Sequence, residues 1–512
     1  MLIQPQQMIA TESAWIEKGG DAGELMDIAG DGIARAISSF FPEQGARGTM
    51  VLALGPGNNA GDACVAAQLF AERGWIIRWF RAISSSPFSK LTQSKLDALA
   101  TAEELVLGPK EDLPDSLPRP LVVLDGLLGV GARPTLDGEM AEAATKINRW
   151  RTQQGAFTVA MDIPTGLNGE TGVPDKQAVV ADLTAAVGAA KSGMVADQAC
   201  NSVGRLALIP LPQLDLETDE SERVFSPADF SDGPAPSPHD THKNTVGRVL
   251  IIAGSPGMTG AASLTALAAL RTGAGMVTVL TDPACVTEVA LRSSPEVMVR
   301  PIPSDEEIPW SRYDALCIGP GLGNQWNELI LQHLSDAPIP AVIDADALNA
   351  IAAANETTQQ SLLAQATAPR LVTPHHGELR RLLEGADDLP SRRATAHAFV
   401  EKFPAATLLY KGARTIICQQ DEQSPKISYN SSGHSGMASA GMGDTLTGIC
   451  GALLARGIAS HHAASAGAWL HGRAAEFASY HTHLRRSTDS LLASDVIDNI
   501  GAALIDLREH RP

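Results

Sequence analysis

The sequence predicts two α/β domains, each built on a parallel β-sheet that is covered by helices. Its length of 512 residues is more than one compact core usually holds and suits two or three domains. In both halves, short and nearly continuous apolar runs alternate with longer Ala-rich amphipathic segments. Strands that are apolar on both faces belong in a parallel sheet between helices, which predicts a three-layer domain in the N-terminal half and a second α/β domain after it.

The predicted strands can be placed by these apolar runs. In the N-terminal half they are residues 49–54, 75–82, 121–125, 157–162, 183–187 and 205–209. In the C-terminal half they are residues 248–253, 276–280, 315–318, 341–344, 371–373 and 406–410, and an amphipathic helix over 494–507 closes the chain.

A change in composition separates the two halves. Residues 211–240 contain eight acidic residues, five prolines and one basic residue, with no sustained hydrophobic period. Such a segment is typical of a linker. We therefore expect a boundary near residue 222, which gives domains 1–222 and 223–512.

The charge of the chain excludes some partners. It has 39 Lys and Arg residues against 58 Asp and Glu residues, a formal net charge of −19. This charge repels phosphodiester backbones and anionic lipid surfaces, so we expect neither a nucleic acid nor a membrane as a partner. A small anionic ligand is still compatible, because backbone amides and helix N-termini bind phosphate without a basic patch.

The cysteines and the apolar runs indicate the compartment. The six cysteines are scattered, with no CxxC pair and no Cys/His spacing suited to zinc, so we expect reduced and mostly buried thiols. The first residues do not resemble a signal peptide, and no apolar run is long enough to span a membrane. We expect a soluble cytoplasmic protein.

Three loops of the N-terminal half follow predicted strands and carry unusual polar residues. They are GPGNNAGDA at 55–63, DGLLGVGARPT from Asp125, and DIPTGLNG from Asp162. Ligands collect at the C-terminal ends of strands in open α/β sheets, so we expect the three loops to share one edge. Each motif alone also fits an ordinary turn or helix cap. Together with Asn59 and Thr165, the two carboxylates offer the oxygens that a hard cation requires.

Similar loops occur in the C-terminal half, and each has an ordinary structural alternative. AGSPGMTGAASL at 253–264 is by itself a weak phosphate-binding signal, and GPGLG at 319–323 follows a later strand. In DADALN, Asp344 and Asp346 either organise a metal or Asp346 caps a helix, and we favour the cap. TPHHGE at 373–378 fits a capped helix start, and KGART at 411–415 fits a hairpin.

The motif SAGMGDTLTG at 439–448 is the most specific one. Gly441 and Gly443 directly precede an apolar helix pattern, so their N–H groups can form an anion hole for a phosphoryl group. Asp444 is suited to accept the proton of an attacking hydroxyl. Phosphoryl transfer needs mainly these two elements and a magnesium ion. The alternative is a capping Asp beside glycines.

In this combination and order, the motifs resemble the bifunctional NAD(P)H-hydrate repair enzymes, in which an N-terminal epimerase is joined to a C-terminal ADP-dependent dehydratase. The resemblance covers nearly the whole chain. Besides the motifs above, it rests on AAKSG at 189–193, HKNTVGRVLIIAGS at 242–255 and PEVM at 295–298.

The resemblance implies a Rossmann-like domain followed by a ribokinase-like domain. The implied substrates are small molecules, namely ADP and NADH or NADPH hydrated at C6 of the nicotinamide ring. The first domain would interconvert the R and S hydrates. The second would dehydrate the S form with ADP, giving NAD(P)H, AMP and phosphate. The implied cofactors are potassium (K+) in the epimerase domain and magnesium (Mg2+) with ADP, and a homo-oligomer is expected.

The resemblance also assigns the first site. Asp162 would be catalytic, near the reacting ring, and Asn59, Asp125 and Thr165 would bind potassium. The hydrate would be held by Asn58, Asn59, Ala60, Gly61, Asp62, Gly129, Val130, Gly131, Ala132, Arg133, Pro134 and Thr135.

In the second site, the resemblance makes Asp444 the catalytic base, the role that its motif also indicates. Ala261, Gly323, His375 and Asp444 would contact the hydrate. Nucleotide binding falls to Lys411, Gly412, Ala413, Arg414, Thr415 and Gly443.

The chain departs from the family pattern at a few positions. Ala60 and Ala63 replace two glycines of the usual NNGGDG loop, and Ala440 and Met442 stand in the usual GGTGD loop. Two rival interpretations remain: a ribokinase-type small-molecule kinase with an accessory N-terminal domain, and a nucleotide-sensing or scaffold module without turnover.

Overall fold

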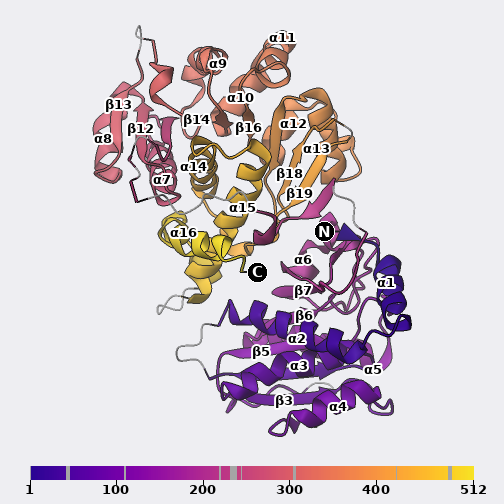
Figure 1. The fold of residues 1–512 in the computed structure, drawn as a ribbon. Coiled ribbons are helices and arrows are strands. Elements are labelled where there is room, and N and C mark those ends of the chain that lie inside the picture. The colour runs from indigo at the N-terminus through magenta and orange to yellow at the C-terminus, as the bar shows by residue number, and fades with distance from the viewer. Residues whose placement is uncertain are drawn as a thin grey trace. The chain divides into compact units, whose positions relative to one another are not determined.

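The computed structural model describes residues 2–41, 47–108, 111–217, 221–230, 239–240, 242–243, 245–303, 307–422, 424–481 and 487–511. The chain forms two compact units (Figure 1). The N-terminal unit spans Met1–Glu220 with Arg511–Pro512, and the C-terminal unit spans Ser221–His510.

The N-terminal unit contains a seven-stranded parallel sheet in the order β4-β3-β2-β5-β6-β7-β9. Its strands are β2 (Thr49–Leu54), β3 (Ile76–Arg81), β4 (Glu103–Glu104), β5 (Leu121–Gly126), β6 (Phe157–Met161), β7 (Leu183–Val187) and β9 (Arg205–Ile209). The six predicted strands are confirmed to within one or two residues. The chain proceeds from β2 outward to β3 and then returns to β5 on the other side of β2, so the strand order reverses between β2 and β5.

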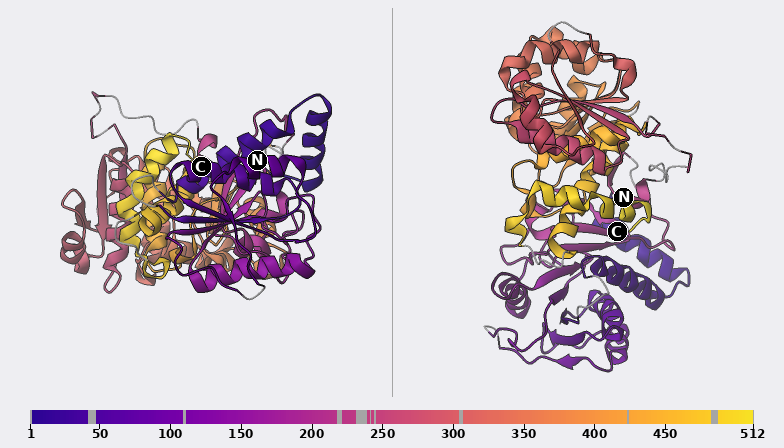
Figure 2. Two further views of the ribbon diagram at one scale, coloured as in Figure 1. Left: turned by 90° about the horizontal axis from the view of Figure 1, so that it is seen from below. Right: turned by 90° about the vertical axis from the view of Figure 1, so that its left-hand side faces the viewer.

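Helices cover both faces of this sheet. They are α1 (Pro5–Glu17), α2 (Ala22–Ser38), α3 (Asn59–Glu72), α4 (Lys90–Ala98), α5 (Gly138–Gln154) and α6 (Cys200–Val203). α2 and α3 pack together on one face, and the buried residues of α5, including Trp150, join those of β2, β3 and β5 in a core on the other face (Figures 1 and 2). A short strand at the start of the chain, β1 (Leu2–Ile3), pairs in parallel with β8 (Ala190–Lys191).

The C-terminal unit is built on a ten-stranded sheet in the order β10-β19-β18-β17-β16-β15-β14-β11-β12-β13. Its strands are β10 (Glu222–Val224), β11 (Arg248–Ile252), β12 (Met276–Thr281), β13 (Met298–Pro301), β14 (Ala315–Ile318), β15 (Ala341–Ile343), β16 (Arg370–Val372), β17 (Ala406–Tyr410), β18 (Ile416–Gln419) and β19 (Lys426–Tyr429). Among the strands described here, β18 alone runs antiparallel to both of its neighbours. The strand order reverses between β11 and β14.

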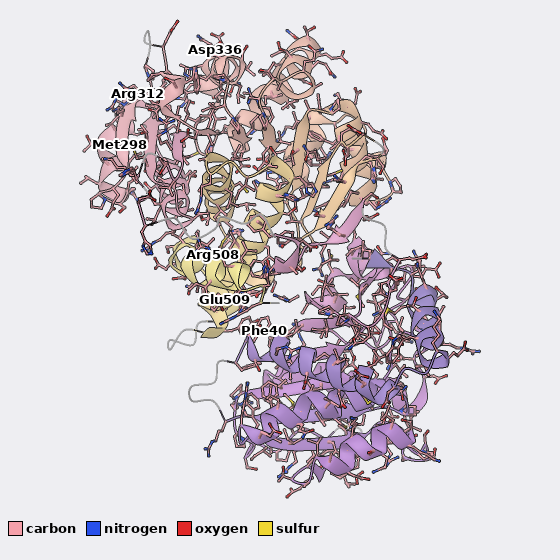
Figure 3. The ribbon with its side chains drawn as sticks, in the orientation of Figure 1. Phe40, Met298, Arg312, Asp336, Arg508 and Glu509 are labelled. Carbon is pink, nitrogen blue, oxygen red and sulfur yellow. The ribbon has the colours of Figure 1, made fainter. Side chains whose placement is uncertain are left out.

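The helices of this unit are α7 (Thr259–Arg271), α8 (Val286–Arg292), α9 (Asn327–Asp336), α10 (Ala345–Ala353), α11 (Glu356–Gln359), α12 (His376–Leu382), α13 (Arg392–Lys402), α14 (Met442–Ala455), α15 (Ser460–Glu476) and α16 (Ala493–Arg508). The main core joins the sheet to α7, α14, α15 and α16. Figure 3 marks Asp336 at the end of α9 and Arg508 at the end of α16. Helix α16 confirms the closing helix that the sequence predicts over 494–507.

The expectation that residues 211–240 form a linker is wrong in part. Glu222–Val224 forms strand β10, which pairs in parallel with β19. The Arg393 guanidinium donates hydrogen bonds to the Glu222 carboxylate, and the Tyr429 hydroxyl also donates to it. The acidic composition was misleading because this carboxylate is paired within the fold. Residues 218–220 and 231–238 lie outside the described residues.

Three smaller expectations can be compared with the structure. The six cysteines are free thiols, and all but the half-buried Cys200 are buried, as predicted. Lys411–Thr415 joins β17 to the antiparallel β18, so KGART forms a hairpin turn. Among the described helices, none is both long and apolar enough to cross a membrane.

Candidate functional sites

The first candidate site lies where β2, β5 and β6 end. These three strands are neighbours in the parallel sheet, so the loops that follow them meet at one edge, as predicted. The edge lies at the reversal of strand order, where ligands bind in open α/β sheets.

Asp162 occupies a strained position at this edge. It follows β6 with φ of 64°, in the left-handed region that non-glycine residues rarely adopt. Its side chain is held by two partners: the Val187 N–H donates to Oδ1 over 3.0 Å, and the Lys191 ammonium forms an ion pair with the same oxygen. The Lys191 side chain is fully buried. The carboxylate is therefore fixed in one orientation by a buried positive charge.

The proposed potassium ligands lie together. The Thr165 hydroxyl donates to Asp125 Oδ1 over 2.7 Å, and the Thr165 N–H donates to Asp125 Oδ2 over 2.8 Å. The Thr165 hydroxyl accepts from the Leu128 N–H, and the Asn59 amide donates to the Leu128 carbonyl. Burial raises the pKa of Asp125 to about 6, although its hydrogen bonds to Thr165 and Leu127 oppose this shift.

The residues predicted to hold the hydrate come from two segments. α3 begins at Asn59, so the second half of GPGNNAGDA is helical and not loop, because the Asn58 carbonyl accepts from the N–H groups of Gly61 and Asp62. The loop over 129–135, which is half-buried at Gly129 and mostly exposed from Gly131, approaches this helix: a Cβ added to Gly129 would lie 3.5 Å from the Asn59 Cβ.

The two alanines that replace family glycines are fully buried. A Cβ added to Gly126 of β5 would lie 3.2 Å from the Ala63 Cβ and 3.3 Å from the Ala60 Cα. The missing side chain of Gly126 thus leaves room for the Ala63 methyl group. This methyl group packs against the sheet, which explains how the substitution is accommodated.

The second candidate site lies at the corresponding edge of the C-terminal unit. The loops after β14 and β15 reach it, together with Lys411 after β17 and the start of α14. The Lys411 ammonium forms an ion pair with Asp344 Oδ1 at 2.7 Å and lies 4.0 Å from Glu378 Oε2. The Thr447 hydroxyl donates to the other oxygen of Asp344 over 2.8 Å.

Asp444 lies in the first turn of α14, beside this network. Gly441, with φ of 85°, occupies the N-cap position, and the helix begins at Met442. A Cβ added to Gly443 would lie 3.4 Å from the Lys411 Nζ, so the first turn faces the lysine. Burial, with the charges of Asp344 and Asp346, raises the pKa of Asp444 to about 6, while Lys411 opposes the shift.

Other predicted residues of this site are positioned by hydrogen bonds. His375 caps α12: its Nδ1 accepts from the Gly377 N–H over 2.9 Å, and its own N–H donates to Glu378, so the alternative of a capped helix start is confirmed. The expectation that Asp346 caps a helix is wrong, because Asp344 occupies the N-cap position of α10. Asp346 instead accepts from the Gly323 N–H over 2.8 Å and fixes that loop.

The remaining predicted residues differ in their exposure. A Cβ added to Gly321 would lie 3.0 Å from the Ala261 Cβ, so α7 touches the loop that carries Gly323. Gly412 and Ala413 are exposed, whereas the buried Arg414 donates to the Asn430 carbonyl over 3.1 Å. The Thr415 hydroxyl donates to the Gly412 carbonyl and closes the hairpin turn.

Both sites contain charged residues to which the sequence assigned no role. In the N-terminal unit these are Lys191 and Glu12, and in the C-terminal unit Glu378; Asp344 was named only as a possible metal ligand, and its pairing with Lys411 was not predicted. Lys191 belongs to AAKSG, so the motif was found but not its contact with Asp162. In the described part of the chain, no group of three or more His, Cys, Asp or Glu side chains is arranged to hold a metal ion.

Comparisons with known proteins match the two halves of the chain to different family models. A family model described as YjeF-related protein N-terminus matches residues 22–193, and one described as NAD(P)H-hydrate dehydratase matches residues 249–499. The bifunctional NAD(P)H-hydrate repair enzyme Nnr of Moorella thermoacetica is 32% identical over 95% of this chain and 93% of its own length. The chain belongs to the bifunctional NAD(P)H-hydrate repair enzyme family.

Further relatives include the Nnr enzyme of Escherichia coli, 32% identical over 93% of this chain and 88% of its own length. A solved structure of the ADP/ATP-dependent NAD(P)H-hydrate dehydratase of Bacillus subtilis is 25% identical, covers 56% of this chain and 98% of its own chain, and has a TM-score of 0.46. Membership of the family and the two doubly wound sheets confirm the predicted order of a Rossmann-like domain and a ribokinase-like domain.

Proposed function

We propose that this protein repairs hydrated NADH and NADPH in two steps. The N-terminal unit interconverts the R and S hydrates, and the C-terminal unit uses ADP to dehydrate the S form, which yields NAD(P)H, AMP and phosphate. One observation supports the proposal: in each unit of this family member, the predicted catalytic carboxylate lies beside a lysine that is paired with an aspartate, among loops that follow the sheet strands.

In the N-terminal unit, Asp162 moves the proton that the exchange requires. The lone pair of the ring nitrogen expels the C6 hydroxyl as water, and water then attacks the planar iminium from either face. Asp162 is suited to take a proton from that water, because Lys191 and the Val187 N–H hold its carboxylate at the sheet edge. Asn58, Asn59, Ala60, Gly61, Asp62 and residues 129–135 would hold the hydrate.

Potassium fits the group formed by Asn59, Asp125 and Thr165. Amide, carboxylate and hydroxyl oxygens are ligands of hard cations. Asp125 is buried, and the groups that hydrogen-bond to it, Thr165 and Leu127, carry no charge. Bound potassium would supply the missing positive charge and stabilise the two loops.

In the C-terminal unit, Asp444 accepts the proton of the C6 hydroxyl as this hydroxyl attacks the terminal phosphoryl group of ADP. The free N–H groups at the start of α14 stabilise the developing negative charge. Phosphate then leaves with loss of a C5 proton, and the ring double bond returns. Magnesium would enter with ADP, and Asp346 is suited to hold it.

Lys411 and its partners orient the nucleotide in this step. Although burial lowers the pKa of Lys411, the carboxylates of Asp344 and Glu378 raise it above its ordinary value, so the side chain is an ammonium. We assign Lys411 and Gly443 to the phosphates of ADP, with Gly412, Ala413, Arg414 and Thr415 beside them. Ala261, Gly323 and His375 would contact the hydrate. The family resemblance further supports a cytoplasmic homo-oligomer.

The experiment that tests the proposal is the recovery of absorbance at about 340 nm, the absorption of the reduced nicotinamide ring. Purified protein is mixed with potassium, magnesium and a mixture of R and S NADH hydrates, with or without ADP. We expect complete recovery that depends on ADP. Recovery that stops at the S fraction would contradict the epimerase assignment, and a stable phosphorylated product would favour a kinase.

A further inference from the structure

Helix α1 borders the first candidate site, although no predicted site residue lies on it. Strand β1, which precedes the helix, pairs with β8 and therefore lies beside Lys191. Gln4 accepts a hydrogen bond from the Ser192 hydroxyl over 3.1 Å, directly after that strand. At the other side of the site, a Cβ added to Gly131 would lie 3.8 Å from the Ile9 Cδ1. The helix thus connects the lysine loop to the loop predicted to hold the hydrate.

Glu12 is the carboxyl group that α1 brings to this site. It lies three residues after Ile9, on the same side of the helix, and is half-buried. Burial and the charge of Asp162 raise the pKa of Glu12, whereas Lys191 opposes the shift, so the carboxyl lies within range of both partners of the ion pair. No described residue forms a hydrogen bond or ion pair with it that would occupy it.

Asp62 of α3 completes the set of charged groups. Burial, followed by the charges of Asp162 and Glu12, raises the pKa of Asp62 well above its ordinary value. Three carboxyl groups thus share one ammonium, that of Lys191, which is engaged by Asp162. Because burial and neighbouring negative charges both disfavour an ionised carboxyl group, the raised pKa values of Glu12 and Asp62 favour the protonated form, which can donate a proton.

We propose that Glu12 is a second catalytic residue of the R/S exchange, which donates a proton to the departing C6 hydroxyl while Asp162 serves the incoming water. The inference rests on the proposed function of the N-terminal unit. Two carboxyl groups in different surroundings are typical of acid–base sites, and here α1 brings Glu12 to the edge at which Asp162 follows β6.

The proton balance of the step is complete. The C6–O bond breaks, the ring nitrogen lone pair forms the C6–N double bond, and the proton of Glu12 joins the leaving hydroxyl as water. A second water then forms a new C6–O bond from the opposite face, and its proton passes to Asp162. Exchange of protons with solvent restores both groups, and the reverse reaction uses them in the opposite roles.

The test compares E12Q with E17Q in the full chain. Glu17 lies on the same helix but is exposed, so it is the matched control. The exchange rate is followed by chromatographic separation of R and S NADH hydrates without ADP, and the dehydratase rate by phosphate release from the pure S hydrate with ADP. We expect E12Q to slow the exchange about 100-fold with an unchanged dehydratase rate, and E17Q to behave as wild type.

The pH profile distinguishes a catalytic role from a structural one. Because an acid must be protonated to act, the wild-type exchange rate should fall at alkaline pH, and E12Q should lose this limb while E12D keeps it at a lower rate. An E12Q rate within twofold of wild type, or an E12Q profile that keeps the alkaline limb, would overturn the inference. A wild-type protein without any exchange would instead overturn the proposed epimerase, and the inference with it.

Discussion

The two candidate sites use a carboxylate and a lysine in different arrangements. In the N-terminal unit, Lys191 pairs directly with Asp162, the predicted catalytic carboxylate. In the C-terminal unit, the lysine is paired with Asp344, and the predicted catalytic residue Asp444 lies beside that pair. Both sites are built from loops that follow the strands of an α/β sheet, so the difference arises from the loops and not from the fold class.

This difference teaches how similar sheets can support different chemistry. A carboxylate that is paired with a buried ammonium, as Asp162 is with Lys191, is held in one orientation and can position a water molecule. A buried carboxylate beside other carboxylates has a raised pKa and can act as a general base near neutral pH, as Asp444 can with a pKa of about 6. The two proposed roles therefore differ with the partner of the lysine: Lys191 pairs with Asp162 itself, whereas Lys411 pairs with Asp344 beside Asp444.

The largest expected effect comes from removing the general base of the C-terminal unit. D444N should reduce ADP-dependent dehydration about 1,000-fold or more, because the amide cannot accept the hydroxyl proton, while nucleotide binding changes little. The rate is measured as phosphate release from the S hydrate, and ADP binding by calorimetry.

The control for this variant is D388N, which alters an exposed carboxylate of the same unit. The R/S exchange rate should be unchanged in both variants. Dehydration by D444N at more than about one tenth of the wild-type rate would exclude Asp444 as the general base.

The next effect concerns stability, where the same substitution should act with opposite signs in the two units. D162N leaves the buried Lys191 without its carboxylate, which should lower the free energy of unfolding by about 3 kcal/mol. D444N removes a carboxylate whose pKa the fold raises from 3.8 to about 6, so it should stabilise the C-terminal unit at pH 7 by about 3 kcal/mol.

Thermal denaturation combined with hydrogen exchange can assign each change to its unit. Asn tolerates the left-handed conformation of residue 162, so D162N adds no backbone strain. Two destabilised variants would show that Asp444 is compensated in a way that the raised pKa does not describe.

Much of the fold could be predicted from the sequence because parallel strands that are buried on both faces give continuous apolar runs. Short edge strands do not: β4 consists of two exposed glutamates, and β10 lies in a stretch whose acidic composition resembles a linker. Such strands depend on pairing with a neighbour, Glu222–Val224 with β19 for example, and local sequence carries little record of that pairing.

The sites were predictable to a similar degree. A motif at a strand end identified Asp162, because polar residues after an apolar strand stand out, and glycines before an apolar helix pattern identified Asp444. The role of Lys411 came from the family resemblance of its motif. The partners were not predicted: Lys191 meets Asp162 across two strand ends, and Glu12 comes from a helix 150 residues earlier in the chain than Asp162. Contacts between distant segments need the three-dimensional arrangement.

A third prediction concerns pH. Since Asp444 must be unprotonated to act, the kcat/KM of dehydration should fall about tenfold for each pH unit below about 6. D344N should move this limb to lower pH, because the charge of Asp344 contributes to the raised pKa of Asp444. Phosphate release from the pure S hydrate measures the profile without contribution from the exchange. An unmoved limb in D344N would show that Asp444 is not the titrating group.

The smallest expected effect separates the two units by their response to potassium. A cation that binds only the folded state at ten times its Kd stabilises that state by about 1.4 kcal/mol. Potassium chloride should therefore raise the melting temperature of the N-terminal unit relative to choline chloride at equal ionic strength, and D125N should abolish the difference.

D125N should also be the more stable protein without potassium, because the fold raises the pKa of Asp125 to about 6 by burying it without a cationic partner. The C-terminal unit, where Lys411 already supplies a positive charge to Asp344, should respond equally to both salts. Equal stabilisation of the N-terminal unit by choline and potassium would contradict the assignment of Asn59, Asp125 and Thr165.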